Sequence, residues 1–213
     1  MRHAEVSYVG ERDPEVVRLT ERGLEQAAAA HRALEDVDFD LIVTSSLPRT
    51  VETAAIVAPG REPEQWPAFD EWRGGRLDAI PPEELEQAFV GSLQIRDEEA
   101  RFLGGESLGE ALDRVLPAFD RLVAEEWETA LAVFHGGVNR ILISHALAGG
   151  RAYFGNFEQA PACINVLDCD GRGETGWIVR TVNYIPYDPL HPARTTTMEH
   201  LWSELRVWLD ERA

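Results

Sequence analysis

The spacing of hydrophobic residues alternates between helical and extended patterns along the first part of the chain. Residues 20–34 combine apolar positions at helical spacing with a run of alanines, and Thr20 is a favourable N-cap residue, so we predict a helix there. Residues 39–44 form a short apolar run typical of a buried strand, and Pro48 begins a helical pattern that extends to about residue 58. Strand, loop and helix in this order predict a βα unit.

The same order recurs further along the chain. Residues 129–134 form a second buried run, and after the loop His135-Gly136-Gly137 the pattern is helical to about residue 148. Segments 163–168 and 176–184 flank a turn-rich spacer and predict a β-hairpin. Strands that alternate with helices favour an α/β fold. We expect a three-layer α/β/α sandwich with a mostly parallel central sheet and the hairpin at one edge.

Two further segments complete the single domain that we expect over residues 1–213. Residues 59–82 are rich in Pro, Gly and Trp without a clear period, and helices are predicted over about 83–102 and 107–127. The region of about residues 60–105 is therefore a small helical cap insertion.

The C-terminal segment of about residues 197–211 is an amphipathic helix by its pattern. Its large apolar side chains fall on one helical face: Met198, Leu201, Trp202, Leu205, Trp208 and Leu209. We expect this helix to dock on its own domain, with a homodimer contact as the alternative.

Charge and composition exclude several classes of function. The formal net charge is −18, without an arginine-rich run, which disfavours nucleic acid and anionic membranes as partners. All 20 residues counted as Lys or Arg are Arg, so Schiff-base chemistry, a pyridoxal-phosphate anchor and a P-loop lysine are excluded. Only 2 cysteines are present and the apolar runs are too short to span a bilayer, so we expect a cytoplasmic protein.

Three polar motifs stand where they can share one crevice. Arg2-His3-Ala4-Glu5 lies at the start of the chain, Ser45-Ser46-Leu47-Pro48-Arg49 follows the first buried strand, and His135-Gly136-Gly137 follows the second. Ligands of open parallel sheets gather at the carboxyl ends of the strands, so the histidines and arginines of these motifs should converge.

Such a set of side chains suits a phosphoryl group. A neutral imidazole is a competent nucleophile towards phosphorus, and guanidinium groups match phosphate oxygens in bidentate fashion. Glycines after His135 allow backbone N–H groups at a helix N-terminus to approach an anion. We therefore expect neither a metal nor another cofactor, and the remaining histidines show no metal-ligand spacing: His31, His145, His191 and His200.

A general acid must protonate the leaving oxygen. Glu71 is our first candidate, because its neighbours Phe69 and Trp72 would raise its pKa by desolvation. The adjacent Asp70 is the competing candidate.

These motifs together resemble the histidine phosphatase superfamily, also called the phosphoglycerate-mutase-like group. Arg2-His3-Ala4-Glu5 resembles its Arg-His-Gly-Glu motif, and the segments that begin at Leu19, Ser45, Gly104 and His135 resemble its later motifs in the same order. The resemblance covers about residues 2–184 and implies an enzyme of this family.

The resemblance also implies roles for single residues. His3 would be transiently phosphorylated, Arg2, Arg49 and His135 would grip the phosphoryl oxygens, and Glu71 would move the proton. By the same resemblance, substrate contacts are expected from Ser7, Gly23 and the backbone N–H of Gly136.

Two positions depart from the family pattern. Only Met1 precedes Arg2-His3, where relatives have several apolar residues of the central strand, so either the start lies upstream or the sheet lacks part of its middle strand. In the second case His3 would sit on a fraying end. Val9 stands where mutase-like and many phosphatase-like members have Asn, which weakens one phosphate contact and argues against close similarity to a mutase.

The expected activity is metal-independent hydrolysis of a small phosphorylated metabolite through a phosphohistidine on His3. A phosphoglycerate-mutase-type phosphotransferase is one alternative, although His135-Gly136-Gly137 resembles phosphatases more than the Asn-Ser pattern of mutases. A scaffold that binds phosphate without catalysis is the other.

Overall fold

A short parallel sheet forms the centre of the computed structural model, which describes residues 1–8, 13, 15–94, 97–170, 176–190 and 195–210. Strand β1 (Leu41–Thr44) lies between β2 (Glu64–Gln65) and β3 (Ala130–Val133), and both pairings are parallel. Successive side chains of a strand point to opposite faces, so Ile42 and Val43 enter different hydrophobic clusters on the two sides of the sheet.

The first residues of the chain continue this sheet beyond β3. Phe134 donates its backbone N–H to Met1 O at 2.9 Å, and His3 donates to Phe134 O at 2.9 Å. On the other side Arg2 donates to Cys163 O at 3.1 Å, and Ala162 donates to His3 O at 3.0 Å. The middle strand is short, with residues 1–3 only, but it is bonded on both sides and its residues are buried, so His3 does not lie at a fraying end.

The hairpin at the edge is confirmed. Strands β4 (Ile164–Cys169) and β5 (Trp177–Tyr184) pair antiparallel, with Asp168 opposite Ile178. Because β4 begins directly after Cys163, the hairpin follows on from the middle strand.

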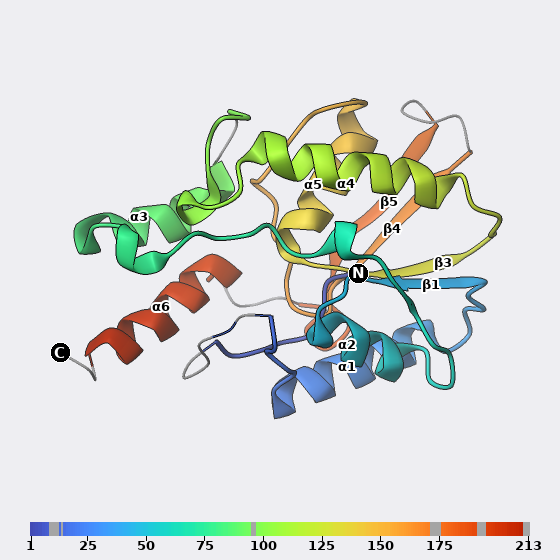
Figure 1. The fold of residues 1–213 in the computed structure, drawn as a ribbon. Helices are drawn as coiled ribbons and strands as arrows, with labels where there is room; N and C mark the ends of the chain where they lie inside the picture. The colour runs from blue at the N-terminus through green and yellow to red at the C-terminus, as the bar shows by residue number, and fades with distance from the viewer. Residues whose placement is uncertain (9–12, 14, 95–96, 171–175, 191–194, 211–213) are drawn as a thin grey trace.

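Helices cover both faces of the sheet, as the three-layer prediction requires (Figure 1). Helices α1 (Glu21–Leu34) and α2 (Pro48–Val57) pack together on one face, and α4 (Leu108–Val123) and α5 (Gly136–Ala148) on the other. Thr20 caps α1 as predicted, because its side chain accepts from the N–H of Gly23 at 3.0 Å.

The predicted helix over residues 83–102 is wrong. The only α-helix described there is α3 (Leu85–Val90), which stands between the 3₁₀ turns Pro82–Glu84 and Gly91–Gln94. Gly91, the C-cap residue of α3, accounts for the early end of the helix, since glycine disfavours continued helix.

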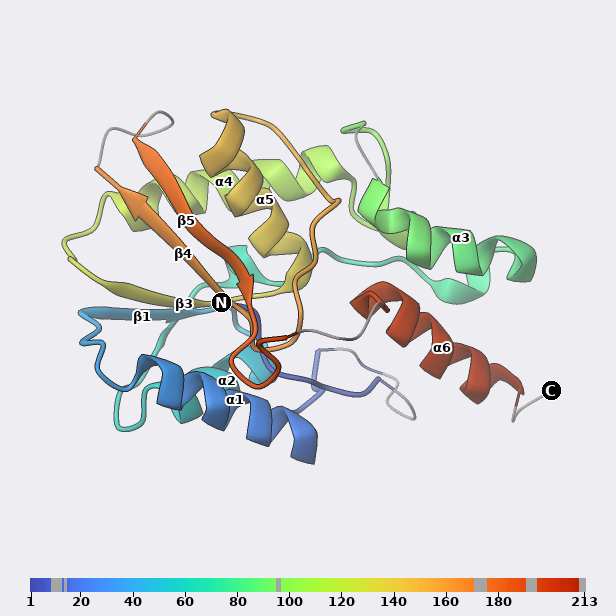
Figure 2. The ribbon, with the colours of Figure 1, turned by 180° about the vertical axis from the view of Figure 1, so that it is seen from behind.

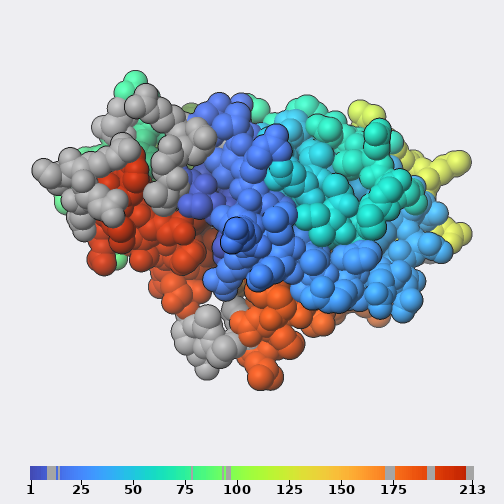
Figure 3. All heavy atoms as spheres, turned by 90° about the horizontal axis from the view of Figure 1, so that it is seen from below, coloured from blue at the N-terminus to red at the C-terminus, as the bar shows by residue number. Residues whose placement is uncertain are grey.

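Helix α6 (Thr197–Asp210) lies beside α3, outside the sandwich (Figure 2). The rings of Phe89 on α3 and Trp202 on α6 are 6.0 Å apart. In the space-filling view α6 adjoins the N-terminal residues (Figure 3). The C-terminal helix therefore docks on its own chain.

Candidate active site

Two buried histidines face each other where the middle strand and β3 end. The ring centroids of His3 and His135 are 5.1 Å apart, with an angle of 62° between the ring planes. Strand β3 ends at Val133, and Phe134 forms a bridge with Arg2. His135 comes next and is the N-cap residue of α5. The two rings thus lie together at the carboxyl ends of the strands, where the positions of the motifs predict that they converge.

The hydrogen bond of His3 fixes the position of its proton. Its Nδ1 lies 2.7 Å from the carbonyl oxygen of Ala4. A carbonyl only accepts, so Nδ1 carries the hydrogen and Nε2 keeps its lone pair. This is the tautomer that a nucleophile attacking through Nε2 needs.

Both imidazoles are held neutral. The pKa of His3 is well below its ordinary value, because burial disfavours the charged ring and the charges of Arg49 and Arg2 oppose it. The pKa of His135 is lowered in the same way, first by burial and then by Arg49. A neutral His3 is therefore available for attack at neutral pH and below.

A chain of hydroxyl groups orients His135. Its Nε2 lies 2.8 Å from Ser45 Oγ, which lies 2.9 Å from Thr50 Oγ1. His135 Nδ1 is buried and has no hydrogen-bond partner among the described residues. The sequence places Ser45 in the loop after β1, but no sequence signal identifies its partner, because that bond joins residues far apart along the chain.

The arginines of the two motifs are buried beside the histidines. Arg2 is 8% exposed and Arg49, in the first turn of α2, is 3% exposed. Arg2 Nη1 donates to Gln159 O at 2.6 Å, whereas its Nε is buried without a partner in the described part of the chain. A Cβ on Gly136 would lie 3.6 Å from Arg2 Nε, so this nitrogen adjoins the N-terminus of α5. An anion bound there would meet both donors.

The structure separates the two candidate acids. Glu71 Oε1 accepts from the N–H of Gly137 at 3.1 Å, so this carboxylate lies at the N-terminus of α5 beside His135. Asp70 is instead held by Ser46, whose N–H and hydroxyl both donate to Asp70 Oδ1 at 2.8 Å. Asp70 thus anchors the loop after β1, whereas the carboxylate of Glu71 lies at the N-terminus of α5.

Arg114 and Glu106 hold the segment that carries these acids. Arg114 donates through Nε and Nη2 to both carboxylate oxygens of Glu106, at 2.9 and 2.8 Å. Its Nη1 donates to the carbonyl oxygens of Ala68 and Asp70, at 2.8 and 2.9 Å. No local sequence pattern identifies this role of Arg114 and Glu106, because their contacts join segments distant in sequence.

The other predicted substrate contacts are those of Ser7, near the start of the chain, and Gly23, in the first turn of α1. A Cβ on Gly23 would lie 2.3 Å from Glu5 O, so Gly23 lets α1 pack against the segment after His3. Ser7 is half-buried, and its contact with substrate stays a prediction, as does that of Gly23. Val9 lies outside the described residues.

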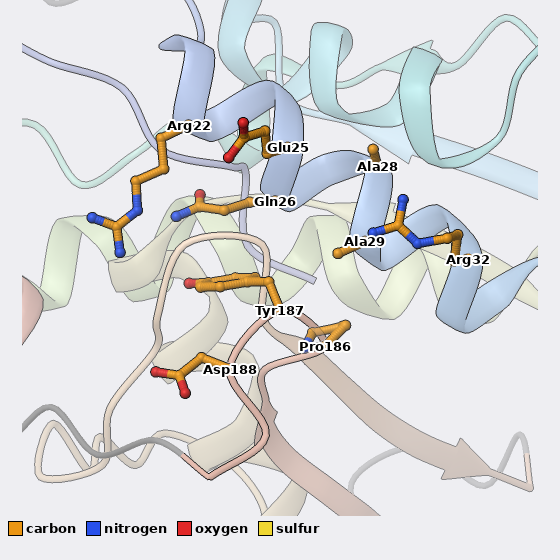
Figure 4. Close-up of a pocket in the computed structure, with 9 residues that line it drawn as sticks. All are labelled: Arg22, Glu25, Gln26, Ala28, Ala29, Arg32, Pro186, Tyr187 and Asp188. Atoms are coloured by element: carbon orange, nitrogen blue, oxygen red, sulfur yellow. The ribbon is translucent and has the colours of Figure 1, made fainter.

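A groove of about 780 Å³ lies elsewhere, between α1 and the segment after β5 (Figure 4). The side chains of Arg22, Gln26 and Tyr187 gather at one end of it. None of the predicted catalytic residues lines this groove. Within the described ranges no cluster of His, Cys, Asp or Glu is arranged to hold a metal ion, and no helix is long and apolar enough to cross a membrane.

Comparison with known proteins agrees with this geometry. The profile of the histidine phosphatase superfamily (branch 1) matches residues 1–184. A probable 2-carboxy-D-arabinitol-1-phosphatase of Arabidopsis thaliana is 29% identical over 183 residues, which are 81% of this chain and 37% of that protein. The chain thus spans little more than a third of that relative's length.

Two further similar proteins are a mutase and a phosphatase. A 2,3-bisphosphoglycerate-dependent phosphoglycerate mutase of Methylobacterium radiotolerans is 32% identical over 150 residues, 64% of this chain and 69% of that protein. The crystal structure of the alpha-ribazole phosphatase from Shigella flexneri superposes with a TM-score of 0.68 at 26% identity, covering 86% of this chain and 94% of that one.

Proposed function

This chain belongs to branch 1 of the histidine phosphatase superfamily, and on that basis we propose that it is a metal-independent phosphomonoesterase acting on a small phosphorylated metabolite. One observation carries the proposal. His3 is buried, neutral and bonded through Nδ1 to Ala4 O, which directs the lone pair of Nε2 away from the backbone. This preorganises a nucleophile beside two buried arginines.

The reaction proceeds in two balanced steps. His3 Nε2 attacks phosphorus, the ester P–O bond breaks, and the protonated Glu71 gives its proton to the leaving oxygen. Water then attacks the phosphohistidine, Glu71 takes a proton from that water, and the P–N bond breaks to release phosphate. Glu71 lies at the N-terminus of α5, the helix that begins directly after His135, and its carboxylate is therefore next to the proposed phosphoryl site.

The phosphoryl group is bound between Arg2, Arg49 and His135. Arg2 Nε and His135 Nδ1 are both buried and lack partners among the described residues, and phosphoryl oxygens would satisfy them. For His135 Nδ1 to donate, Ser45 must donate its hydroxyl hydrogen to Nε2, and the 2.8 Å separation allows this. The backbone N–H of Gly136 is the further donor that we assign.

A mutase remains the second candidate because a phosphoglycerate mutase is among the relatives at 32% identity. The two functions differ in the fate of the phosphohistidine, which a mutase passes to a second acceptor hydroxyl. Activity that depends on added 2,3-bisphosphoglycerate would favour the mutase. Hydrolysis without it favours the phosphatase, which names such as alpha-ribazole phosphatase also support.

The cellular setting is part of the proposal. We infer that the protein is cytoplasmic and has no nucleic-acid partner, in keeping with the net charge of −18. Homodimerisation through α6 stays a prediction, supported by the exposed Val207 and Leu209 on that helix. Sedimentation of the wild type and of a Val207→Asp variant would test it.

The decisive experiment is hydrolysis of radiolabelled p-nitrophenyl phosphate in excess EDTA, with the phosphoenzyme trapped by an alkaline denaturing quench that preserves phosphohistidine. We expect turnover and an acid-labile label in the wild type, and neither in His3→Ala. His200→Ala is the matched control, because His200 is exposed on α6. Turnover abolished by EDTA, or labelling that persists in His3→Ala, would refute the mechanism.

A further inference from the structure

A residue outside the family-matched region touches Arg2. Helix α6 begins at Thr197, whereas the family profile ends at residue 184. Arg2 Nη1 donates to Thr197 Oγ1 at 3.0 Å, and Thr197 Oγ1 lies 2.7 Å from Glu158 Oε1. A guanidinium only donates and a carboxylate only accepts, so the hydroxyl receives a hydrogen bond from Arg2 and gives one to Glu158.

The hydroxyl therefore stands between two opposite charges. Glu158 Oε2 is buried and has no hydrogen-bond partner in the described part of the chain. A carboxylate in that condition gains from pairing directly with a nearby guanidinium. Such a pair with Arg2 would occupy the donors that the phosphoryl group needs.

We propose that Thr197 is a positioning residue that separates Glu158 from Arg2 and thereby keeps Arg2 Nε turned towards the phosphoryl site. The proposal rests on the assignment of Arg2 as a phosphate ligand made above. In this arrangement Arg2 Nη1 is held by Thr197 and by Gln159 O, while Nε lies beside Gly136. Loss of the hydroxyl lets Glu158 compete with phosphate for the same cation.

Two other contacts fix the place of Thr197. The start of α6 is capped by Thr196, which receives the N–H of Glu199 at 3.3 Å and gives its own N–H to Glu199 Oε2 at 2.6 Å. Further along, Trp202 packs against Phe89 of α3. Because these contacts do not involve Arg2, a change at Thr196 weakens the helix without altering the separation of the charges.

The test compares Thr197→Val with Thr197→Ser and Thr196→Val. The dissociation constant of inorganic phosphate is measured by titration calorimetry, and KM and kcat with p-nitrophenyl phosphate. We expect Thr197→Val to weaken phosphate binding about 5- to 20-fold and Thr197→Ser to stay within about 2-fold of the wild type. Thr196→Val should lower the thermal midpoint of unfolding and leave phosphate binding unchanged.

Neutralising Glu158 tests whether this carboxylate competes with phosphate for Arg2. Glu158→Gln alone should tighten phosphate binding about 2- to 3-fold, and Thr197→Val combined with Glu158→Gln should regain most of the lost affinity. Unchanged binding in Thr197→Val, or no recovery in the double variant, would overturn the inference. If Thr197→Val does not fold, the single Glu158→Gln variant decides the question.

The two proposals fail in different ways. A wild type that binds phosphate but shows no turnover and no phosphoenzyme refutes the phosphatase and leaves the role of Thr197 measurable by calorimetry. A wild type that turns over, with a Thr197→Val variant of equal phosphate affinity, refutes only the role of Thr197.

Discussion

Glu71 Oε1 lies 3.1 Å from the backbone nitrogen of Gly137, the second residue of the helix that begins directly after His135. The contact leaves no room for a side chain at Gly137, because a Cβ there would be 2.7 Å from Glu71 Oε1 and 3.2 Å from Trp72 Cβ. The glycine therefore sets how closely the proposed acid approaches the histidine pair.

Gly137→Ala should lower kcat although alanine favours the helix. The replacement gains about 1 kcal/mol of helix propensity, but the displaced carboxylate should cost about 10- to 100-fold in rate. Steady-state kinetics and the thermal midpoint of unfolding measure the two effects separately. Gly74→Ala is the control, since its Cβ would come no closer than 3.5 Å to Leu103. Equal losses of kcat in Gly137→Ala and Gly74→Ala would contradict the role of Gly137 in placing Glu71.

The leaving group distinguishes Glu71 from Asp70 as the acid. Glu71→Gln should slow hydrolysis of an alkyl phosphate about 100-fold or more and that of p-nitrophenyl phosphate much less, because nitrophenolate leaves without a proton. Asp70→Asn loosens the loop through Ser46 and should slow both substrates by the same factor. The hydrolysis rates of both variants are measured on the alkyl phosphate and on p-nitrophenyl phosphate. A selective loss on the alkyl phosphate in Asp70→Asn, and equal losses in Glu71→Gln, would make Asp70 the donor.

Arg114→Lys should lower stability and activity together. A lysine cannot make the paired contact with Glu106 and also reach the carbonyl oxygens of Ala68 and Asp70. We expect a loss of about 2 to 3 kcal/mol in the free energy of unfolding and a fall in kcat. Urea unfolding and steady-state kinetics measure these. Arg101→Lys, which affects an exposed pair with Glu110, should change neither by much.

The buried histidines should make the fold sensitive to acid. The pKa values of His3 and His135 are well below 6.5 in the folded chain, whereas they return to about 6.5 on unfolding. Below that pH the unfolded chain binds more protons, so the free energy of unfolding falls as pH decreases, by at most about 1.4 kcal/mol per pH unit for each histidine. Above it, neither histidine contributes.

Urea unfolding at about pH 7 and about pH 5.5 checks this dependence. Replacing both histidines by asparagine should flatten the loss of stability between the two values. His200→Asn should retain the wild-type loss, because His200 is exposed. If the double variant lost as much stability at the lower pH as the wild type does, other titratable groups would account for the acid sensitivity.

The sequence predicted those parts of the fold that local patterns encode. The buried runs before Ser45 and His135, together with the rule that ligands gather at the carboxyl ends of strands, were enough to bring His3 and His135 together. The helix predicted over 83–102 was wrong because apolar spacing alone does not reveal that the α-helix ends before Gly91.

Local sequence patterns could not predict the residues that hold the site residues in place. Ser45 binds His135, Arg114 binds Ala68 and Asp70, and Thr197 binds Arg2, each across a long stretch of sequence. Such contacts follow from tertiary packing, so neither periodicity nor composition identifies them. The anchoring of His3 could not be predicted for the same reason, since its partners Phe134 and Ala162 come from distant segments.

The middle strand has a consequence for synthesis of the protein on the ribosome. His3 is made well before its backbone partners Phe134 and Ala162, because both follow it at a long distance along the chain. The backbone bonds of the proposed nucleophile can therefore form only after Ala162 has been translated. Catalytic competence therefore arises in one late, non-local closing step, and a nascent chain that stops before Ala162 carries His3 without a complete site around it.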